Sequence, residues 1–440
     1  MLRALHLDFH ILLTLLQRGW NIVAGGITVI FMPVWLTAEE QGYYFTFLSL
    51  LALQVFFELG FNSVIVQLVG HEVAHLKADE FGMLDGDALR VLRLKSLLTL
   101  LRRWYLIAAV AFSAVVSVAG FFFFRAKGGL PVGSWLGVWI ALVFFTSINL
   151  YLSPQLAVFE GVGRVGHVAR LRLIQSMIGY CLMWSALSFG AGLKAVVIST
   201  GISAISSILW LISRKPFLTP SQASTVPEVH RMSWRTEIFP FQWRIAVSWI
   251  SGYFIFQAFT PLVFAHQGAV EAGRLGIALS IFSSISVLGM SWVNASAPKM
   301  AQYIARGERA PLNSMFIIVL RSAVIFTLLA SVAFLLFVQI LGQFHYGLAV
   351  RIASLPVLSC LAFAAVVNSF ISAAAIYMRA HKVEPMLLPS IVGGVLCLLA
   401  AYFGSQVGVR LTVALYASIT ALVGLPWTIH LFLPYFRREA

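Results

Sequence analysis

Apolar runs of about 20 residues follow one another along the whole of the 440-residue chain, separated by short polar connections. A helix of that length rises about 30 Å, the thickness of the hydrocarbon core of a bilayer. No connection is long enough to hold a soluble domain. The pattern predicts an all-α integral membrane protein of about twelve transmembrane helices, at 11–35, 43–69, 104–124, 135–158, 173–191, 193–213, 245–265, 275–297, 321–341, 352–376, 386–404 and 411–433.

The composition supports this prediction. Hydrophobic residues make up 60% of the chain and charged residues only 10%, against roughly 25% in soluble domains. Most of the net charge of +14 comes from Lys and Arg in alternate connections, around 77–103, 164–172, 214–244, 299–321 and 379–382. The positive-inside rule therefore places both termini in the cytoplasm, and the basic charge reflects topology rather than a nucleic-acid partner. Five tryptophans near predicted span ends fit an interfacial position: Trp35, Trp104, Trp135, Trp210 and Trp427.

Short stretches recur between the two halves of the chain. Leu100-Leu101-Arg102 resembles Val319-Leu320-Arg321, and Ala157-Val158-Phe159 resembles Ala375-Ile376-Tyr377. Matching stretches fall on the same predicted side of the membrane, which indicates two parallel six-helix repeats with the substrate path at their interface. We expect an N-terminal bundle at 1–213, a Pro- and Ser-containing cytoplasmic linker at 214–244 and a C-terminal bundle at 245–440.

Polar side chains inside the predicted spans are candidates for function, because they are costly in a bilayer and face a protein interior or a wet cavity. Gln54, Glu58 and Asn62 recur at intervals of four and share one helical face. For an Asn or Gln, the alternative is a hydrogen bond between helices, worth about 1 kcal/mol. The residues expected to line a solvated cavity, for substrate binding or ion coupling, are Arg18, Asn21, Gln54, Glu58, Asn62, Asn149, Gln257, Asn294 and Asn368.

Two motifs suggest other chemistry. His71-Glu72-Val73-Ala74-His75 matches HExxH, in which two histidines bind zinc and the glutamate acts as base, so a zinc-dependent membrane protease is an alternative. The motif lies in one short connection, where polar residues capping a juxtamembrane helix are expected instead. The glycines of Gly161-Val162-Gly163-Arg164-Val165-Gly166 match GxGxxG but follow a predicted span rather than a strand, so they should end a helix and turn the chain. We expect no metal and no cofactor.

The stretch from Leu36 to Tyr44, with Phe57-Glu58-Leu59-Gly60-Phe61-Asn62, resembles the first helix pair of O-antigen and polysaccharide flippases. Glu160-Gly161-Val162-Gly163-Arg164 resembles the loop after their fourth helix. These flippases form the polysaccharide-transporter branch of the multidrug/oligosaccharidyl-lipid/polysaccharide (MOP) exporter superfamily. The resemblance implies a V-shaped pair of six-helix bundles in the bacterial inner membrane. It also implies alternating-access transport of a polyprenyl-pyrophosphate-linked oligosaccharide for surface polysaccharide, such as the O-antigen of lipopolysaccharide.

This function is not enzymatic, and its partners would be the glycosyltransferases and polymerase of a glycan-assembly pathway. No ATP-binding motif is present, so we expect a proton or sodium gradient, or use of the product outside, to drive transport. Glu58 is the best candidate for a titratable coupling group. The alternatives to a flippase are a multidrug exporter of the same superfamily, which would need acidic groups for cationic drugs, the zinc protease, and an inert scaffold for glycan assembly.

Arg18 and Glu58 fall at similar depths in their spans. At 1.5 Å per residue, Arg18 lies roughly 25 Å from Trp35 and Glu58 roughly 22 Å from Tyr43. We expect the two charges to pair at rest, with substrate pyrophosphate or a proton competing for one partner. A static ion pair between adjacent helices is the alternative.

Overall fold

The computed structural model describes residues 9–73, 76–78, 84–86, 88–213, 239–343, 350–381 and 384–437. Within these ranges, nine helices are long and apolar enough to cross a membrane, or ten if one bent pair is counted as a single span. Each of the predicted spans falls on a helix or on a series of consecutive helices. The prediction of an all-α membrane protein is confirmed.

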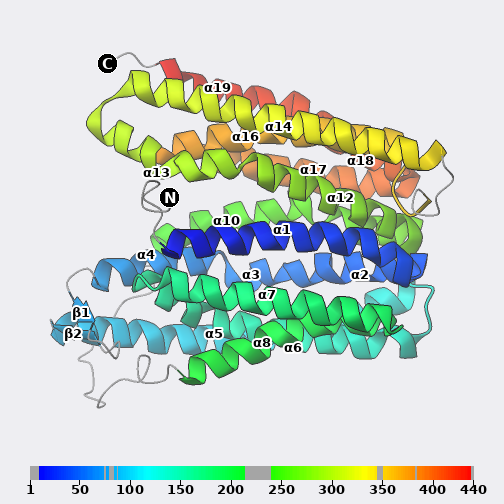
Figure 1. The fold of residues 1–440 in the computed structure, drawn as a ribbon, viewed down its shortest axis with the longest axis horizontal. Helices are drawn as coiled ribbons and strands as arrows, with labels where there is room; N and C mark the ends of the chain where they lie inside the picture. Colours follow the sequence, from blue (N-terminus) through cyan, green and yellow to red (C-terminus); the bar gives the residue numbers. More distant parts are fainter. Residues whose placement is uncertain are drawn as a thin grey trace. The chain divides into compact units, whose positions relative to one another are not determined.

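The elements follow in chain order (Figure 1). They are α1 (Phe9–Trp35), α2 (Ala38–Leu51), the 3₁₀ turn η2 (Ala52–Gln54), α3 (Val55–Glu58), α4 (Phe61–Val73), β1 (Leu76–Ala78), β2 (Leu84–Gly86), α5 (Ala88–Lys127), α6 (Val132–Gly161), α7 (Val165–Ser188), η3 (Gly192–Lys194), α8 (Ala195–Ser213), α10 (Phe239–Phe256), α11 (Phe259–Gln267), α12 (Ala269–Gly289), α13 (Ser291–Arg306), α14 (Arg309–Gln343), α16 (Leu355–Ala380), α17 (Leu387–Val407), α18 (Val409–Ile419), the π-helical turn η6 (Thr420–Gly424) and α19 (Leu425–Arg437).

Two features of the connections differ from the prediction. The helices α5 and α14 begin at Ala88 and Arg309, well before the predicted starts at 104 and 321. A helix satisfies its own backbone hydrogen bonds in water as well as in lipid, and Leu, Lys and Arg favour it, so these polar segments continue the spans. The short hairpin of β1 and β2, with Lys77 opposite Asp85, was not predicted.

The chain forms two compact units. Unit 1 contains residues 1–24, 50–126 and 130–250, and unit 2 contains residues 25–49, 127–129 and 251–440. The loop end of the first helical hairpin, 25–49, thus groups with the C-terminal helices. Most of the expected linker 214–244 lies outside the described residues, so the division at that point stays a prediction.

In unit 1, α5 and α6 pack through aromatic rings. Trp135 and Trp139 are fully buried, with the ring of Phe124 5.5 and 5.4 Å away between centroids. A Cβ atom on Gly120 would lie 2.3 Å from the Trp139 ring, so only glycine allows this approach. Trp135 therefore contributes to helix packing, and its expected place at the membrane interface stays a prediction.

In unit 2, α2 begins with a reciprocal cap and packs tightly on α12. The Thr37 N–H donates to the Glu40 carboxylate (2.9 Å), and the Glu40 N–H donates to the Thr37 hydroxyl (3.2 Å). A Cβ on Gly42 would lie 1.9 Å from the carbonyl oxygen of Ala269, and one on Gly276 would lie 2.3 Å from the Phe45 ring. Glycines on both helices therefore let the two backbones touch.

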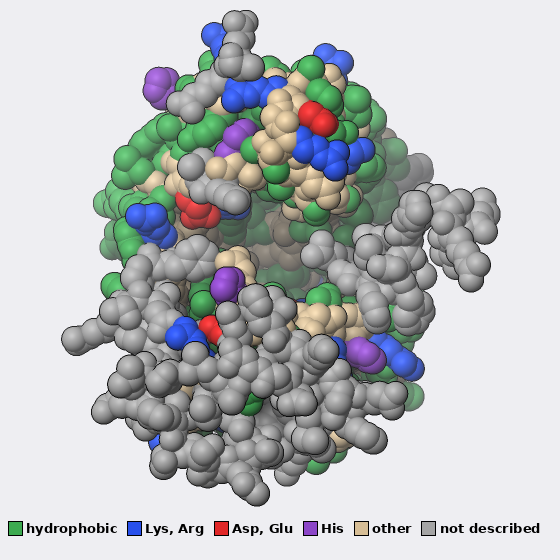
Figure 2. Space-filling view, turned by 90° about the vertical axis from the view of Figure 1, so that its left-hand side faces the viewer, with side chains coloured by type: hydrophobic (Ala, Val, Ile, Leu, Met, Phe, Trp, Pro, Cys, Tyr) green, Lys and Arg blue, Asp and Glu red, His purple; other side chains and the backbone are tan. Residues whose placement is uncertain are grey.

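Basic side chains gather at one end of unit 2, where α13 ends, α14 begins, and α16 and α19 end. The helices are held together there by a buried cluster that includes Phe316, Tyr377 and Phe432. Figure 2 looks onto this end and shows Lys and Arg side chains on its surface. The basic residues in the end turns of these helices are Arg306, Arg309, Arg379 and Arg437.

The second predicted span is broken within unit 1. Leu59 has a φ of +53° and Gly60 a φ of +63°, and the helices on either side are bent by 43°. A left-handed conformation costs a residue with a Cβ about 1–2 kcal/mol. The break thus stores strain directly after Glu58.

We expect Leu59→Gly to be more stable than Leu59→Ala by about 1 kcal/mol, because both variants lose the side chain but only glycine relieves the left-handed strain. Thermal unfolding of the two purified variants measures the difference. Alanine equal to or better than glycine would mean that the break is not strained.

Candidate functional site

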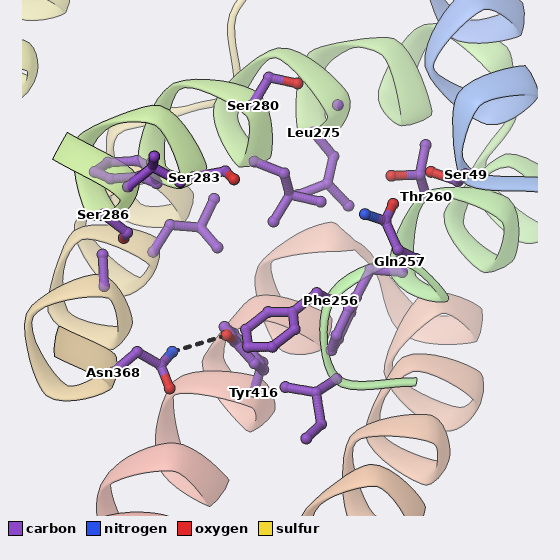
Figure 3. Close-up of a pocket in the computed structure, with 18 of the residues that line it drawn as sticks. Ser49, Phe256, Gln257, Thr260, Leu275, Ser280, Ser283, Ser286, Asn368 and Tyr416 are labelled. Carbon is purple, nitrogen blue, oxygen red and sulfur yellow. Dashed lines mark hydrogen bonds between the residues drawn. The ribbon is translucent and has the colours of Figure 1, made fainter. Parts of the chain in front are cut away.

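Unit 2 contains a cavity of about 640 Å³. This volume lies within the range of roughly 300–1,000 Å³ that is typical of small-molecule sites. Its walls come from α2, α10, α11, α12, α13, α16 and α18 and from the break between α10 and α11 (Figure 3). The lining combines apolar and aromatic side chains, such as Phe256 and Leu275, with hydroxyl and amide groups.

Gln257 reaches the cavity because the helix is interrupted at this point. In a regular helix, the carbonyl of Gln257 would accept a hydrogen bond from residue 261, but Pro261 has no N–H to donate. The helix α10 ends at Phe256 and α11 begins at Phe259. Interrupted backbone at membrane depth is tolerated where it is buried in protein or lines a cavity. Figure 3 shows the Gln257 side chain among the residues that line the cavity, as Thr260 and Ser49 also do.

Three serines of α12 form one wall of the cavity. Ser280, Ser283 and Ser286 are spaced by three residues, which places them along one face of the helix. Their hydroxyls form no hydrogen bond with any other described residue. By contrast, the hydroxyl of Ser284, which does not line the cavity, donates to the carbonyl of Ser280 (2.9 Å). We call Ser280, Ser283 and Ser286 the serine stripe.

A hydrogen-bonded pair lies across the cavity from the serine stripe. The Asn368 side-chain amide, from α16, donates to the Tyr416 hydroxyl, from α18, at 3.0 Å (Figure 3). One turn later, the Thr420 hydroxyl donates to the Tyr416 carbonyl (2.9 Å), where the chain enters the π-helical turn η6. Such turns interrupt α-helices frequently at functional sites. The pair holds the Tyr416 ring against the cavity.

The cavity is electrically neutral. None of the residues that line it is Asp, Glu, Lys, Arg or His. Its polar groups are the hydroxyls of Ser, Thr and Tyr and the amides of Gln and Asn, which both donate and accept hydrogen bonds. The lining therefore suits an uncharged polar ligand with an apolar face.

The structure brings three of the nine predicted site residues together at this cavity, namely Gln257, Asn294 and Asn368. The serine stripe was not predicted, although serines spaced by three within an apolar run are visible in the sequence. Serine is common in transmembrane helices, where its hydroxyl often bonds to the helix's own backbone. Ser280, Ser283 and Ser286 differ from most such serines in that their hydroxyls form no bond with the backbone in the described part of the chain.

Two predicted residues in unit 1 hold helices together. The Asn62 side-chain oxygen accepts hydrogen bonds from the Tyr105 hydroxyl (3.2 Å) and the Ser153 hydroxyl (3.5 Å). The Asn149 amide donates to the Thr200 carbonyl (3.3 Å) and its oxygen accepts from the Ser203 hydroxyl (3.2 Å). These contacts match the alternative weighed for Asn and Gln, namely hydrogen bonds between helices.

Glu58 is the last residue of α3, at the break in the second span. Its carboxylate is attracted by the charge of Arg172, whose guanidinium also pairs with Glu160 at 2.8 Å. The Arg18 side chain lies outside the described part of the chain, so its pairing with Glu58 stays a prediction. Asn21 and Gln54 are half-buried in unit 1 and do not line the cavity of unit 2.

The two sequence motifs take structural roles where the structure describes them. Glu72 of the HExxH stretch is buried and forms an ion pair with Arg93 (3.2 Å), while His75 lies outside the described residues. No group of three metal-ligating side chains occurs within the described ranges. The glycine-rich stretch ends α6 at Gly161 and turns through Gly163, which has a φ of +87°, before α7 starts. The expected helix end and turn are therefore confirmed.

No family model matches the chain, and no curated protein matches it in sequence. Three solved structures share its fold over almost the whole chain. The match to the lipid II flippase MurJ in an inward closed conformation covers 96% of this chain and 86% of the MurJ chain, with 14% sequence identity and a TM-score of 0.65. The match to an inward-facing multidrug resistance MATE transporter covers 97% of this chain and 96% of the transporter, with 16% sequence identity and a TM-score of 0.57. The match to a MOP superfamily transporter from Pyrococcus furiosus covers 98% of this chain and 96% of that transporter, with 15% sequence identity and a TM-score of 0.53. The chain therefore has the same fold as these three transporters.

Proposed function

We propose that the protein is a flippase that moves a lipid-linked oligosaccharide, carried on a polyprenyl pyrophosphate, across a bacterial inner membrane by alternating access. The observation that carries this proposal is the neutral cavity of unit 2, whose hydroxyls and amides suit the hydroxyls of a sugar. The fold supports it, because a lipid II flippase shares this fold over most of both chains.

The same cavity argues against export of cationic drugs by way of unit 2. A cation leaving water needs a compensating negative charge or a ring of well-aimed acceptors, and no carboxylate lines this cavity. The MATE-like fold alone does not decide between the substrates, since one fold serves many functions. The neutral, hydroxyl-rich lining supports a saccharide as the substrate.

In this proposal both termini are cytoplasmic, and the basic end of unit 2 faces the cytoplasm, as the positive-inside rule places it. Glycosyltransferases would supply the lipid-linked saccharide on the cytoplasmic face, and a polymerase or ligase would consume it outside, as in the assembly of O-antigen and related surface polysaccharides. Use of the product, or a proton or sodium gradient, would drive net transport.

The test is translocation by the purified protein in liposomes. We expect a fluorescent polyprenyl-pyrophosphate trisaccharide, loaded in the inner leaflet, to become accessible to an added glycosidase at a rate that rises with the amount of protein. The control is liposomes with heat-inactivated protein. No increase in accessibility, together with gradient-driven uptake of cationic dyes in the same vesicles, would replace the flippase by a drug exporter.

A further inference from the structure

We infer that the cavity of unit 2 is a subsite that binds an uncharged sugar unit, with the serine stripe as its hydrogen-bonding wall, and that it rejects acidic sugars and the pyrophosphate. This inference rests on the proposed function and deepens it, because it names the class of glycan that the protein accepts. Three features of the cavity carry it.

The first feature is a set of polar groups that lack protein partners. The hydroxyls of Ser280, Ser283 and Ser286 and the amide of Gln257 form no hydrogen bond with any other residue in the described ranges, yet all four line the cavity. In unit 1, by contrast, Asn62 and Asn149 are already bonded to neighbouring helices. These groups are open to the cavity, so a ligand can pair with them without breaking any hydrogen bond within the described part of the protein.

The second feature is the character of these groups. Hydroxyls and amides each donate and accept, as sugar hydroxyls do, so one wall can match several hydroxyls of a ring regardless of the direction of each bond. Facing this wall, Figure 3 shows the rings of Phe256 and Tyr416. Aromatic rings present a broad apolar surface, against which the C–H face of a sugar can pack.

The third feature is the absence of charge among the lining residues. A carboxylate or phosphate that entered this cavity would lose its hydration without gaining a cation, which is strongly unfavourable. A neutral sugar has no such penalty. The charged pyrophosphate must therefore lie outside this cavity while the sugar occupies it.

The experiment compares two soluble probes, alkyl trisaccharides that are identical except for one residue, a hexose in one and a hexuronic acid in the other. Binding to the full-length protein in detergent is measured at equilibrium, so that the result does not depend on transport. We expect the neutral probe to bind at least tenfold more tightly than the acidic probe. Equal affinities, or tighter binding of the acidic probe, would overturn the inference.

A matched pair of serine variants on α12 locates the site. Ser283→Ala removes an unpaired hydroxyl that lines the cavity, and we expect it to weaken binding of the neutral probe about three- to tenfold. Ser284→Ala removes a hydroxyl that is bonded to the Ser280 carbonyl away from the cavity, so its affinity should match that of the wild type. Equal effects of the two variants would exclude the serine stripe as the binding wall.

Gln257→Arg places a cation in the cavity and tests the role of charge directly. We expect the preference for the neutral probe to fall by at least tenfold, through tighter binding of the acidic probe. An unchanged preference in a variant that still binds the neutral probe would overturn the argument from charge. Selective binding of the neutral probe without translocation in liposomes would refute the flippase but support the sugar subsite. Translocation without selective binding would support the flippase and refute the subsite.

Discussion

The Glu58→Gln variant is expected to lose transport of a lipid-linked saccharide in liposomes while it is expressed and purified like the wild type. Glu58 is half-buried at the broken point of its span, and glutamine keeps its size while it removes the charge and the titratable proton. If transport is coupled to protons through Glu58, the glutamine side chain cannot take over, because it does not titrate. Initial transport rates with and without an imposed proton gradient measure the effect. Normal transport by the variant would exclude Glu58 as the coupling group.

A second variant distinguishes coupling from a structural counter-charge. Arg172 is the described cation that acts on Glu58, and Arg172→Gln removes it. If Glu58 only neutralised this arginine, the double variant Glu58→Gln/Arg172→Gln should regain transport. If Glu58 carries the proton, the double variant stays inactive.

Gly42→Ala is expected to give the largest loss of stability among single-methyl additions to unit 2. The added Cβ would lie 1.9 Å from the Ala269 carbonyl oxygen and 2.8 Å from its Cα, and both are backbone atoms that cannot rotate aside. The helix α2 must therefore move away from α12, and overpacking of this kind costs about 3 kcal/mol. Thermal or denaturant unfolding of the purified variant measures the loss.

The control is Gly252→Ala in α10, which also belongs to unit 2. A Cβ at Gly252 meets no atom within 4 Å, so this change should be neutral or stabilise the protein by up to about 1 kcal/mol, because alanine favours the helix. A similar loss in both variants would mean that glycine flexibility, rather than the contact of α2 with α12, explains the effect.

Local sequence was sufficient for the spans and for one of the turns between them. Apolar runs predicted each span, since insertion of a helix in a bilayer depends on the sum over its own residues. The turn at Gly161–Gly166 was likewise a local property of its glycines. Gln257, Asn294 and Asn368 stand out in the sequence as polar groups inside apolar runs, and all three line the cavity, while their role in binding stays a prediction.

Local sequence could not separate the polar residues that are paired from those that are open. Asn62, Asn149 and Gln257 look alike in the sequence, yet the first two bond neighbouring helices, whereas Gln257 borders the cavity with its amide open. The difference depends on how each helix is rotated about its axis and on what lies opposite. The same holds for Ser283 and Ser284, which are adjacent in the sequence and face different surroundings.

The sequence by itself therefore determined that this is a helical membrane protein with long spans and basic residues in alternate connections, because hydrophobicity and charge act residue by residue. Only the tertiary structure decided that residues 25–49 group with the C-terminal helices, and that a neutral cavity forms around the break at Gln257 and the serine stripe. These features arise from contacts between helices far apart in the chain. Such contacts depend on shape and on which atoms remain unpaired, and no stretch of sequence contains that information alone.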